Sequence, residues 1–220
     1  MNNIKKTLDF LLSAFENANN EFFNKYPEEK QYRLDHTMRV ANLGKKIAEN
    51  EGLDVEGMVI GCLLHDISYI KPFNNEEDWK NHGREAAKLS KMFVNSLDLN
   101  EATKRDILYG IAIHVDDEAD YDGERTLFAE TIGECDNIDR FDKFRLYESL
   151  KEIDLKSMTL IEQISFCENK IKRLNSLKTT YTFKTATSNK LWNENLDYQI
   201  NYFSLLQSQL NSSNPDLLLI

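Results

Sequence analysis

Apolar residues recur every three or four positions along most of the chain, a spacing that is typical of amphipathic helices. Charged and amide residues occupy the positions between them. The main segments with this pattern are residues 3–24, 31–51, 54–65, 82–97, 100–115, 157–177 and 188–210. Glycine and proline are scarce, with 8 and 3 copies, which favours helices joined by short turns over a many-stranded sheet. We therefore predict an all-α fold.

The length of 220 residues suits one large domain, or a domain of about 150 residues with an extension. We predict that residues 1–154 form a helical domain and that residues 155–220 form a helical extension. This extension has no histidine and carries an aromatic stripe over residues 191–206 that basic residues do not interleave. We expect it to pack on the first domain or on a partner, with a homodimer through these helices as one arrangement, rather than to stack bases.

Polar residues with metal-binding side chains end the apolar stripes of several predicted helices. If the helices bury these stripes against one another, the polar ends meet at one centre. A single inward histidine is usually a hydrogen-bonded core residue, but here all 4 histidines of the chain share the pattern. The residues concerned are His36, His65, Asp66, His82, His114 and Asp136.

These residues also occur in a recognisable order. His36, the sequence Leu64-His65-Asp66-Ile67 and Asp136 resemble the H…HD…D signature of the HD-domain superfamily of metal-dependent phosphohydrolases, over about residues 30–150. The resemblance implies a helical bundle with additional C-terminal helices. It also implies one divalent ion, of manganese, nickel, iron, cobalt or magnesium, bound by His36, His65, Asp66 and Asp136.

The same resemblance implies roles for His82 and His114, which match additional histidines that contact substrate phosphate or help to bind a second metal in some branches. The branch that looks closest comprises small bacterial phosphohydrolases and pyrophosphohydrolases that act on nucleotides. Val115 follows His114, so the paired histidines of the cyclic-di-GMP phosphodiesterase branch are missing. That activity is therefore not expected.

Two imidazoles and two carboxylates can balance a divalent charge and leave open positions for water and a phosphoryl oxygen. We predict hydrolysis of a small phosphorylated metabolite, most plausibly a nucleotide, with Asp66 orienting the water and His82 and His114 assisting. An anionic phosphate needs further donors. The candidates are Lys71, His82, His114, Arg39 and Arg140, with Arg33 beside them.

Several of these assignments have a structural alternative. Arg33 and Arg39, one helical turn on either side of His36, could belong to a solvated helix face. Asp139 lies one turn after Asp136, where it could orient a metal ligand from behind or cap the next helix. The acidic loop 116–122 lacks the register of a calcium-binding loop, so we expect it to be solvated.

The remaining properties bound the function. The formal net charge is −10, which disfavours a nucleic-acid surface and makes an HD-type nuclease a weaker alternative than a sensor that binds metal or nucleotide without turnover. The 3 cysteines are far apart and are expected to be buried thiols in a reducing compartment. No signal peptide or membrane span is expected. The default location is the cytoplasm.

Overall fold

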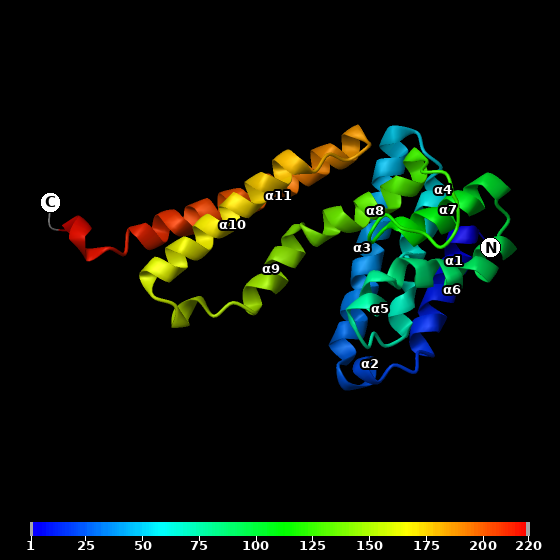
Figure 1. Ribbon diagram of the computed structural model, residues 1–220, viewed down its shortest axis with the longest axis horizontal. Coiled ribbons are helices and arrows are strands. Elements are labelled where there is room, and N and C mark those ends of the chain that lie inside the picture. Colours follow the sequence, from blue (N-terminus) through cyan, green and yellow to red (C-terminus); the bar gives the residue numbers. More distant parts are fainter. Residues whose placement is uncertain (1, 219–220) are drawn as a thin grey trace. The chain divides into compact units, whose positions relative to one another are not determined.

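The computed structural model describes residues 2–218, without the side chains of residues 216 and 217. Within this range the chain forms eleven α-helices and no strand (Figure 1), which confirms the predicted all-α fold. The helices are α1 (Asn3–Glu16), α2 (Glu21–Lys25), α3 (Pro27–Glu51), α4 (Val55–Leu64), α5 (Glu76–Lys80), α6 (His82–Ser96), α7 (Glu101–Ile113), α8 (Leu127–Arg140), α9 (Lys143–Lys151), α10 (Leu160–Thr180) and α11 (Ala186–Asn211). Short 3₁₀ helices occupy Ile67–Ile70, Leu155–Ser157 and Pro215–Leu218.

The described chain divides into two compact units. The first unit runs to Asp139 and includes Lys184–Ser188, and the second comprises Arg140–Phe183 and the residues from Asn189 on. The predicted first domain ends at residue 154 and would include α9, whereas α9 falls in the second of these units. All residues predicted to bind the metal therefore lie in the first unit.

The centre of the first unit is α4, in which every residue from Gly57 to Leu64 is buried. A helix that is apolar on all sides must be covered on all sides, and α1, α3 and α7 pack on it (Figure 1). Gly61 on α4 and Gly110 on α7 both face the side chain of Ile132 on α8, where an added Cβ would overlap its terminal methyl group. These glycines let α8 lie close to α4 and α7.

The helix boundaries follow local capping. Asp54 accepts a hydrogen bond from the backbone of Gly57 and so begins α4, while Gly52 ends α3 in the left-handed conformation with φ of 69°. Such residues are the usual helix start and stop signals. The sequence predicted α4 correctly to within a residue, because its cap and its apolar run coincide.

One predicted helix is interrupted. The pattern over residues 3–24 predicted a single helix, but α1 ends at Glu16 and α2 begins only at Glu21. The side chain of Asn20 caps α2 by accepting from the backbone of Phe22, and it also donates to the carbonyl of Tyr69. Asparagine competes well with helical backbone hydrogen bonds, and here a contact with a distant segment fixes the break.

The second unit consists of α9, α10 and α11. Lys178 pairs with Asp197 at 2.5 Å and Phe166 meets Phe203 at 5.9 Å between ring centroids, so α10 and α11 run antiparallel. A capping box between Thr159 and Glu162 begins α10. The two long C-terminal helices were predicted, whereas α9 was not. None of the helices in the described part of the chain combines the length and the apolar composition that a membrane span needs.

Candidate metal centre

Four of the predicted metal ligands converge from three separate parts of the first unit. His36 lies on α3, His65 and Asp66 directly follow α4, and Asp136 lies on α8. The Nε2 atom of His36 is 3.1 Å from an Asp136 oxygen and 3.6 Å from Oδ2 of Asp66. The Nε2 atom of His65 is 3.5 Å from the same Asp66 oxygen and 3.9 Å from the Asp136 oxygen. All four residues are buried, so their polar atoms face one another rather than solvent.

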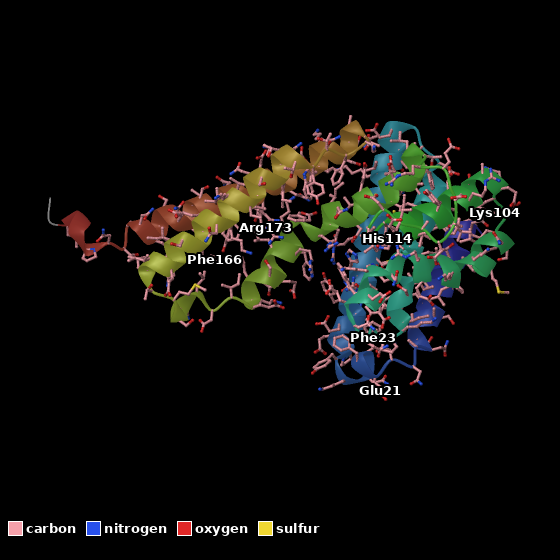
Figure 2. The ribbon with its side chains drawn as sticks, in the orientation of Figure 1. Glu21, Phe23, Lys104, His114, Phe166 and Arg173 are labelled. Carbon is pink, nitrogen blue, oxygen red and sulfur yellow. The ribbon has the colours of Figure 1, made fainter. Side chains whose placement is uncertain are left out.

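Two further histidines approach the other oxygen of Asp66. The Nε2 atoms of His82 and His114 lie 3.3 Å and 3.7 Å from Oδ1 of Asp66, and 3.2 Å from each other. Figure 2 shows His114 among the helices of the first unit. Asp66 thus stands between two groups that could each hold a metal ion, one with His36 and His65 and one with His82 and His114.

A hydrogen bond at Nδ1, on the side of the ring away from the centre, fixes the orientation of three of the histidines. Nδ1 of His65 donates to the carbonyl of Cys62 and Nδ1 of His114 to that of Ile111, both at 2.7 Å. Nδ1 of His82 donates in the same way to the carbonyl of Trp79. A carbonyl can only accept, so Nδ1 carries the proton in the neutral ring and the lone pair of Nε2 faces the centre. This is the arrangement found behind metal-binding histidines.

The Nε2 atom of His65 is buried and has no hydrogen-bond partner within the described chain, whereas the buried Nε2 atom of His36 faces only the carboxylate oxygens of Asp66 and Asp136. Buried polar atoms without a partner are rare in folded proteins, and each needs a physical explanation. A divalent ion bound between these nitrogens and the oxygens of Asp66 and Asp136 would satisfy both of them. The donor set of imidazole and carboxylate suits zinc and the divalent ions of manganese, iron, cobalt and nickel.

The family model of the HD domain matches residues 33–141. The chain belongs to the HD-domain superfamily. In its fold it is similar to a crystal structure of a predicted HD superfamily hydrolase from an uncultured Thermotogales bacterium, with a TM-score of 0.64 and 14% sequence identity. The similarity covers 94% of this chain and 93% of that one. No match was found among curated proteins.

We call Asp66, Asp136 and the four histidines around them the HD centre. Its two carboxylates are held in the ionised form. Burial by itself raises the pKa of Asp66, but the neighbouring His65 and Arg33 outweigh it and hold this pKa well below its usual range. The pKa of Asp136 is likewise lowered, because hydrogen bonding to His36 and the electrostatic influence of the nearby His65 and His36 outweigh its burial. Both carboxylates therefore carry the negative charge that a divalent ion requires.

The two imidazoles nearest these carboxylates differ in protonation. Burial lowers the pKa of His65 to about 4, so this ring is neutral near pH 7. Burial also opposes the charged form of His36, but hydrogen bonds that the protonated ring donates to Asp136 and Asp139 outweigh it and raise the pKa of His36 to about 9. In the protein without metal, His36 is thus protonated and gives up this proton when it becomes a ligand.

Asp139 orients His36, which settles one of the alternatives left by the sequence. Its Oδ2 accepts from Nδ1 of His36 at 2.7 Å, and Arg39 holds the same carboxylate through Nε and Nη2 at 2.8 Å and 3.1 Å. Asp139 lies inside α8, so the expectation that it caps the next helix is wrong. The cap of α9 is Asp142, three residues later, because α8 continues to Arg140.

The remaining predicted phosphate donors lie in different surroundings. Arg33 contacts Oδ2 of Asp66 at 2.8 Å and its guanidinium stacks 3.6 Å from the ring centroid of Tyr69, so it is part of the HD centre. Lys71 is half exposed and pairs with Glu85. Arg39 supports His36 through Asp139, and Arg140 is exposed at the end of α8. Substrate binding by Lys71, Arg39 and Arg140 stays a prediction.

An aromatic set beside His82, formed by Tyr69, Phe73 and Trp79, was not predicted. The ring centroids of these residues lie 5.4 Å, 6.0 Å and 5.9 Å from that of His82. All three come from the segment between Asp66 and His82, which lies outside the predicted helices and contains a 3₁₀ helix and α5. The sequence did contain a signal for this set, because three aromatic residues are unusual in a segment that is otherwise mostly polar.

We predict that Asp139→Asn weakens metal binding by about 10-fold to 100-fold. A neutral amide holds the His36 ring less firmly than a carboxylate does, and it makes the ligating nitrogen of His36 less basic. Isothermal titration of Mn²⁺ or Zn²⁺ measures the affinity. Asp35→Asn, at an exposed position next to His36 on α3, is the matched control and should bind like the unmodified protein. Equal affinity in both variants would show that Asp139 does not support the ligand.

Metal binding should also release a proton from His36. Since the pKa of His36 is raised to about 9, the ring is protonated below that pH, and apparent affinity should rise by up to about tenfold per pH unit until pH passes this value. His65 contributes no such release near neutral pH because its pKa is lowered to about 4. Titration calorimetry in two buffers with different ionisation enthalpies counts the released protons. An affinity that does not change with pH between neutrality and the pKa of His36 would contradict this prediction.

Proposed function

We propose that the HD centre hydrolyses a phosphate ester or phosphoanhydride bond of a small metabolite. The observation that carries this proposal is the convergence of four histidine Nε2 atoms on the two carboxylates of Asp66 and Asp136 in a buried site. A bound divalent ion would supply a Lewis acid and a water molecule that is easily deprotonated. The side chains of the protein have to bind the phosphate, orient the water, and accept and donate protons.

Asp66 is best placed to orient the attacking water. Its Oδ2 faces His36, His65 and Arg33, whereas its Oδ1 faces His82 and His114. A carboxylate that stays ionised and presents one oxygen on each side can bind a metal ion with one and accept a hydrogen bond with the other. The depressed pKa of Asp66 suits it to orienting water rather than to keeping a proton.

The phosphate would be held by cationic donors around this carboxylate. Burial lowers the pKa of His114, but Asp66 outweighs it, so the pKa of His114 is raised and its protonated form is favoured. Nε2 of the protonated His114 can then donate a hydrogen bond to a phosphoryl oxygen beside His82, and Arg33 can donate from the opposite side. A group that is protonated and lies close to the phosphate can also donate to the leaving oxygen.

The aromatic set supports a nucleotide as the substrate. Trp79 is 41% exposed although it is a large aromatic residue, and it lies in contact range of His82. An exposed aromatic ring next to a phosphate-binding group can stack on a base while the phosphate is held by the histidines. The absence of a basic run and the net charge of −10 favour a small nucleotide over a nucleic acid.

The central test is metal-dependent phosphate release. Protein treated with a chelator and resupplied with Mn²⁺, Ni²⁺ or Co²⁺ should release phosphate or pyrophosphate from at least one member of a nucleotide panel. His65→Ala should lower this rate by more than about 100-fold, because it removes a ligand that Cys62 holds in place. Asn175→Ala, at an exposed position on α10, should leave it unchanged. A ligand that stabilises the protein but is recovered intact under every metal would favour a sensor instead.

Removal of one aromatic ring should separate base binding from chemistry. Trp79→Ala should raise KM for the nucleotide by about tenfold, in line with the 1–3 kcal/mol expected for a stacked base, and leave kcat within a few-fold. The backbone carbonyl that orients His82 is retained in this variant. Trp79→Phe should restore most of the affinity, and hydrolysis of inorganic pyrophosphate should not change. A loss in kcat alone would place Trp79 in the support of His82 and not in substrate binding.

A further inference from the structure

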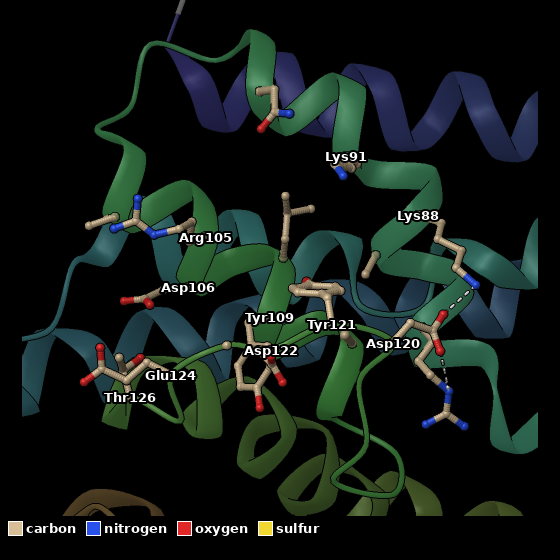
Figure 3. Close-up of a pocket in the computed structure, with 17 residues that line it drawn as sticks. Lys88, Lys91, Arg105, Asp106, Tyr109, Asp120, Tyr121, Asp122, Glu124 and Thr126 are labelled. Atoms are coloured by element: carbon tan, nitrogen blue, oxygen red, sulfur yellow. Dashed lines mark ion pairs between the residues drawn. The ribbon is translucent and has the colours of Figure 1, made fainter.

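A cavity of about 660 Å³ lies in the first unit between α6, α7 and the loop that leads to α8 (Figure 3). None of the histidines and aspartates of the HD centre lines it. Its volume is in the range of pockets that bind small organic molecules, about 300–1,000 Å³. Because it is formed by residues outside the centre, it needs a separate explanation.

Two tyrosines form the middle of this cavity. Tyr109 on α7 and Tyr121 in the loop meet edge to face, with 6.0 Å between their ring centroids, and Figure 3 shows both between groups of charged side chains. Gly123 lies against the Tyr109 ring so closely that an added Cβ would overlap it. Ala87, Leu108 and Ala112 complete an apolar wall. A surface of this kind fits a planar ring.

One end of the cavity carries carboxylates. Asp106 is half-buried, and its pKa is raised by burial and by the nearby charge of Glu124, although a hydrogen bond from Thr126 and the charge of Arg105, which also lines this end, oppose the shift. Glu124 forms no ion pair with any residue in the described part of the chain. Figure 3 shows Asp106 and Glu124 together on one side of the two tyrosines. Two carboxylates placed so close together favour a ligand that brings hydrogen-bond donors.

Two lysines of α6 also line the cavity. Lys88 lies on the other side of the tyrosines from Asp106 (Figure 3) and pairs with Asp120 at 2.6 Å. Lys91, one helical turn farther along α6, also lines the cavity and forms no ion pair between residues 2 and 218. A lysine without a partner at the rim of an aromatic pocket can receive an anionic group, such as a phosphate, at low desolvation cost.

We propose that this cavity binds an amino-substituted heteroaromatic phosphate, the chemical class of nucleotides whose base carries an exocyclic amino group. The ring lies against Tyr109 and Tyr121, the amino group donates to Asp106 and Glu124, and the phosphate pairs with Lys91. This binding does not depend on hydrolysis at the HD centre, since the two sites share no lining residue. The proposal therefore stands or falls separately from the proposed function.

The test measures binding of three probes to the full chain in the presence of a chelator, which prevents turnover. We expect AMP to bind, IMP to bind at least about tenfold more weakly, and ribose 5-phosphate to show no measurable binding. IMP presents a carbonyl where AMP has an amino group, and a carbonyl opposite two carboxylates leaves acceptors unpaired. Failure of AMP to bind, or equal binding of AMP and IMP, would overturn the proposal.

Variants locate the bound probe. Tyr121→Ala should weaken AMP binding by about tenfold, because the base loses a stacking partner. Tyr198→Ala is the matched control, because Tyr198 is 47% exposed and Tyr121 is 48% exposed. It should leave AMP binding unchanged. Asp106→Asn should lower the ratio of AMP affinity to IMP affinity, because the amide supplies a donor to the carbonyl of IMP. If Asp106 had only a structural role, this ratio of affinities would not change. If His65→Ala abolishes AMP binding while Tyr121→Ala keeps it, the probe occupies the HD centre and the proposal is wrong.

Discussion

The burial of one ionised carboxylate, Asp66, is the constraint on which the rest of the first unit depends. Taking a carboxylate out of water costs several kcal/mol unless cations and hydrogen-bond donors replace the solvent. Arg33 donates to Oδ2 of Asp66 and the protonated His36 faces the same oxygen, while His114, whose protonated form is favoured, faces Oδ1. His65 and His82 also face this carboxylate, so its position fixes how α3, α4, α6 and α7 approach one another.

Three histidines of the HD centre perform a structural and a chemical task with one hydrogen bond each. His65, His82 and His114 donate from Nδ1 to a carbonyl three residues earlier, near the C-terminal end of the preceding helix. The last carbonyls of a helix lack an intrahelical partner, so each imidazole closes a helix end. The same bond leaves Nε2 free to face the centre. Helix termination and ligand orientation are therefore inseparable at these positions.

The HD centre and the cavity beside Tyr109 and Tyr121 have two helices in common. The first residue of α6 is His82 and one later turn of that helix carries Lys88, while α7 carries Tyr109 and ends next to His114. A ligand in the cavity would contact both helices without touching a residue of the centre.

The sequence by itself determined which faces of the helices are buried and which polar residues end those faces. Apolar spacing and the scarcity of glycine and proline predicted an all-α chain, and the stripes that end at His36, His65, His82, His114 and Asp136 indicated a common centre. Such patterns report burial, because an inward position must be apolar or else bonded to a partner. They do not report which partner it meets.

The tertiary structure decided the pairings between distant segments. It placed Asp139 behind His36 by continuing α8 past it, turned Arg39 toward Asp139, and broke the first predicted helix where Asn20 reaches the carbonyl of Tyr69. It also gathered Tyr69, Phe73 and Trp79 around His82. These contacts join residues through packing and hydrogen bonds that depend on three-dimensional proximity, and local spacing contains no information about that proximity.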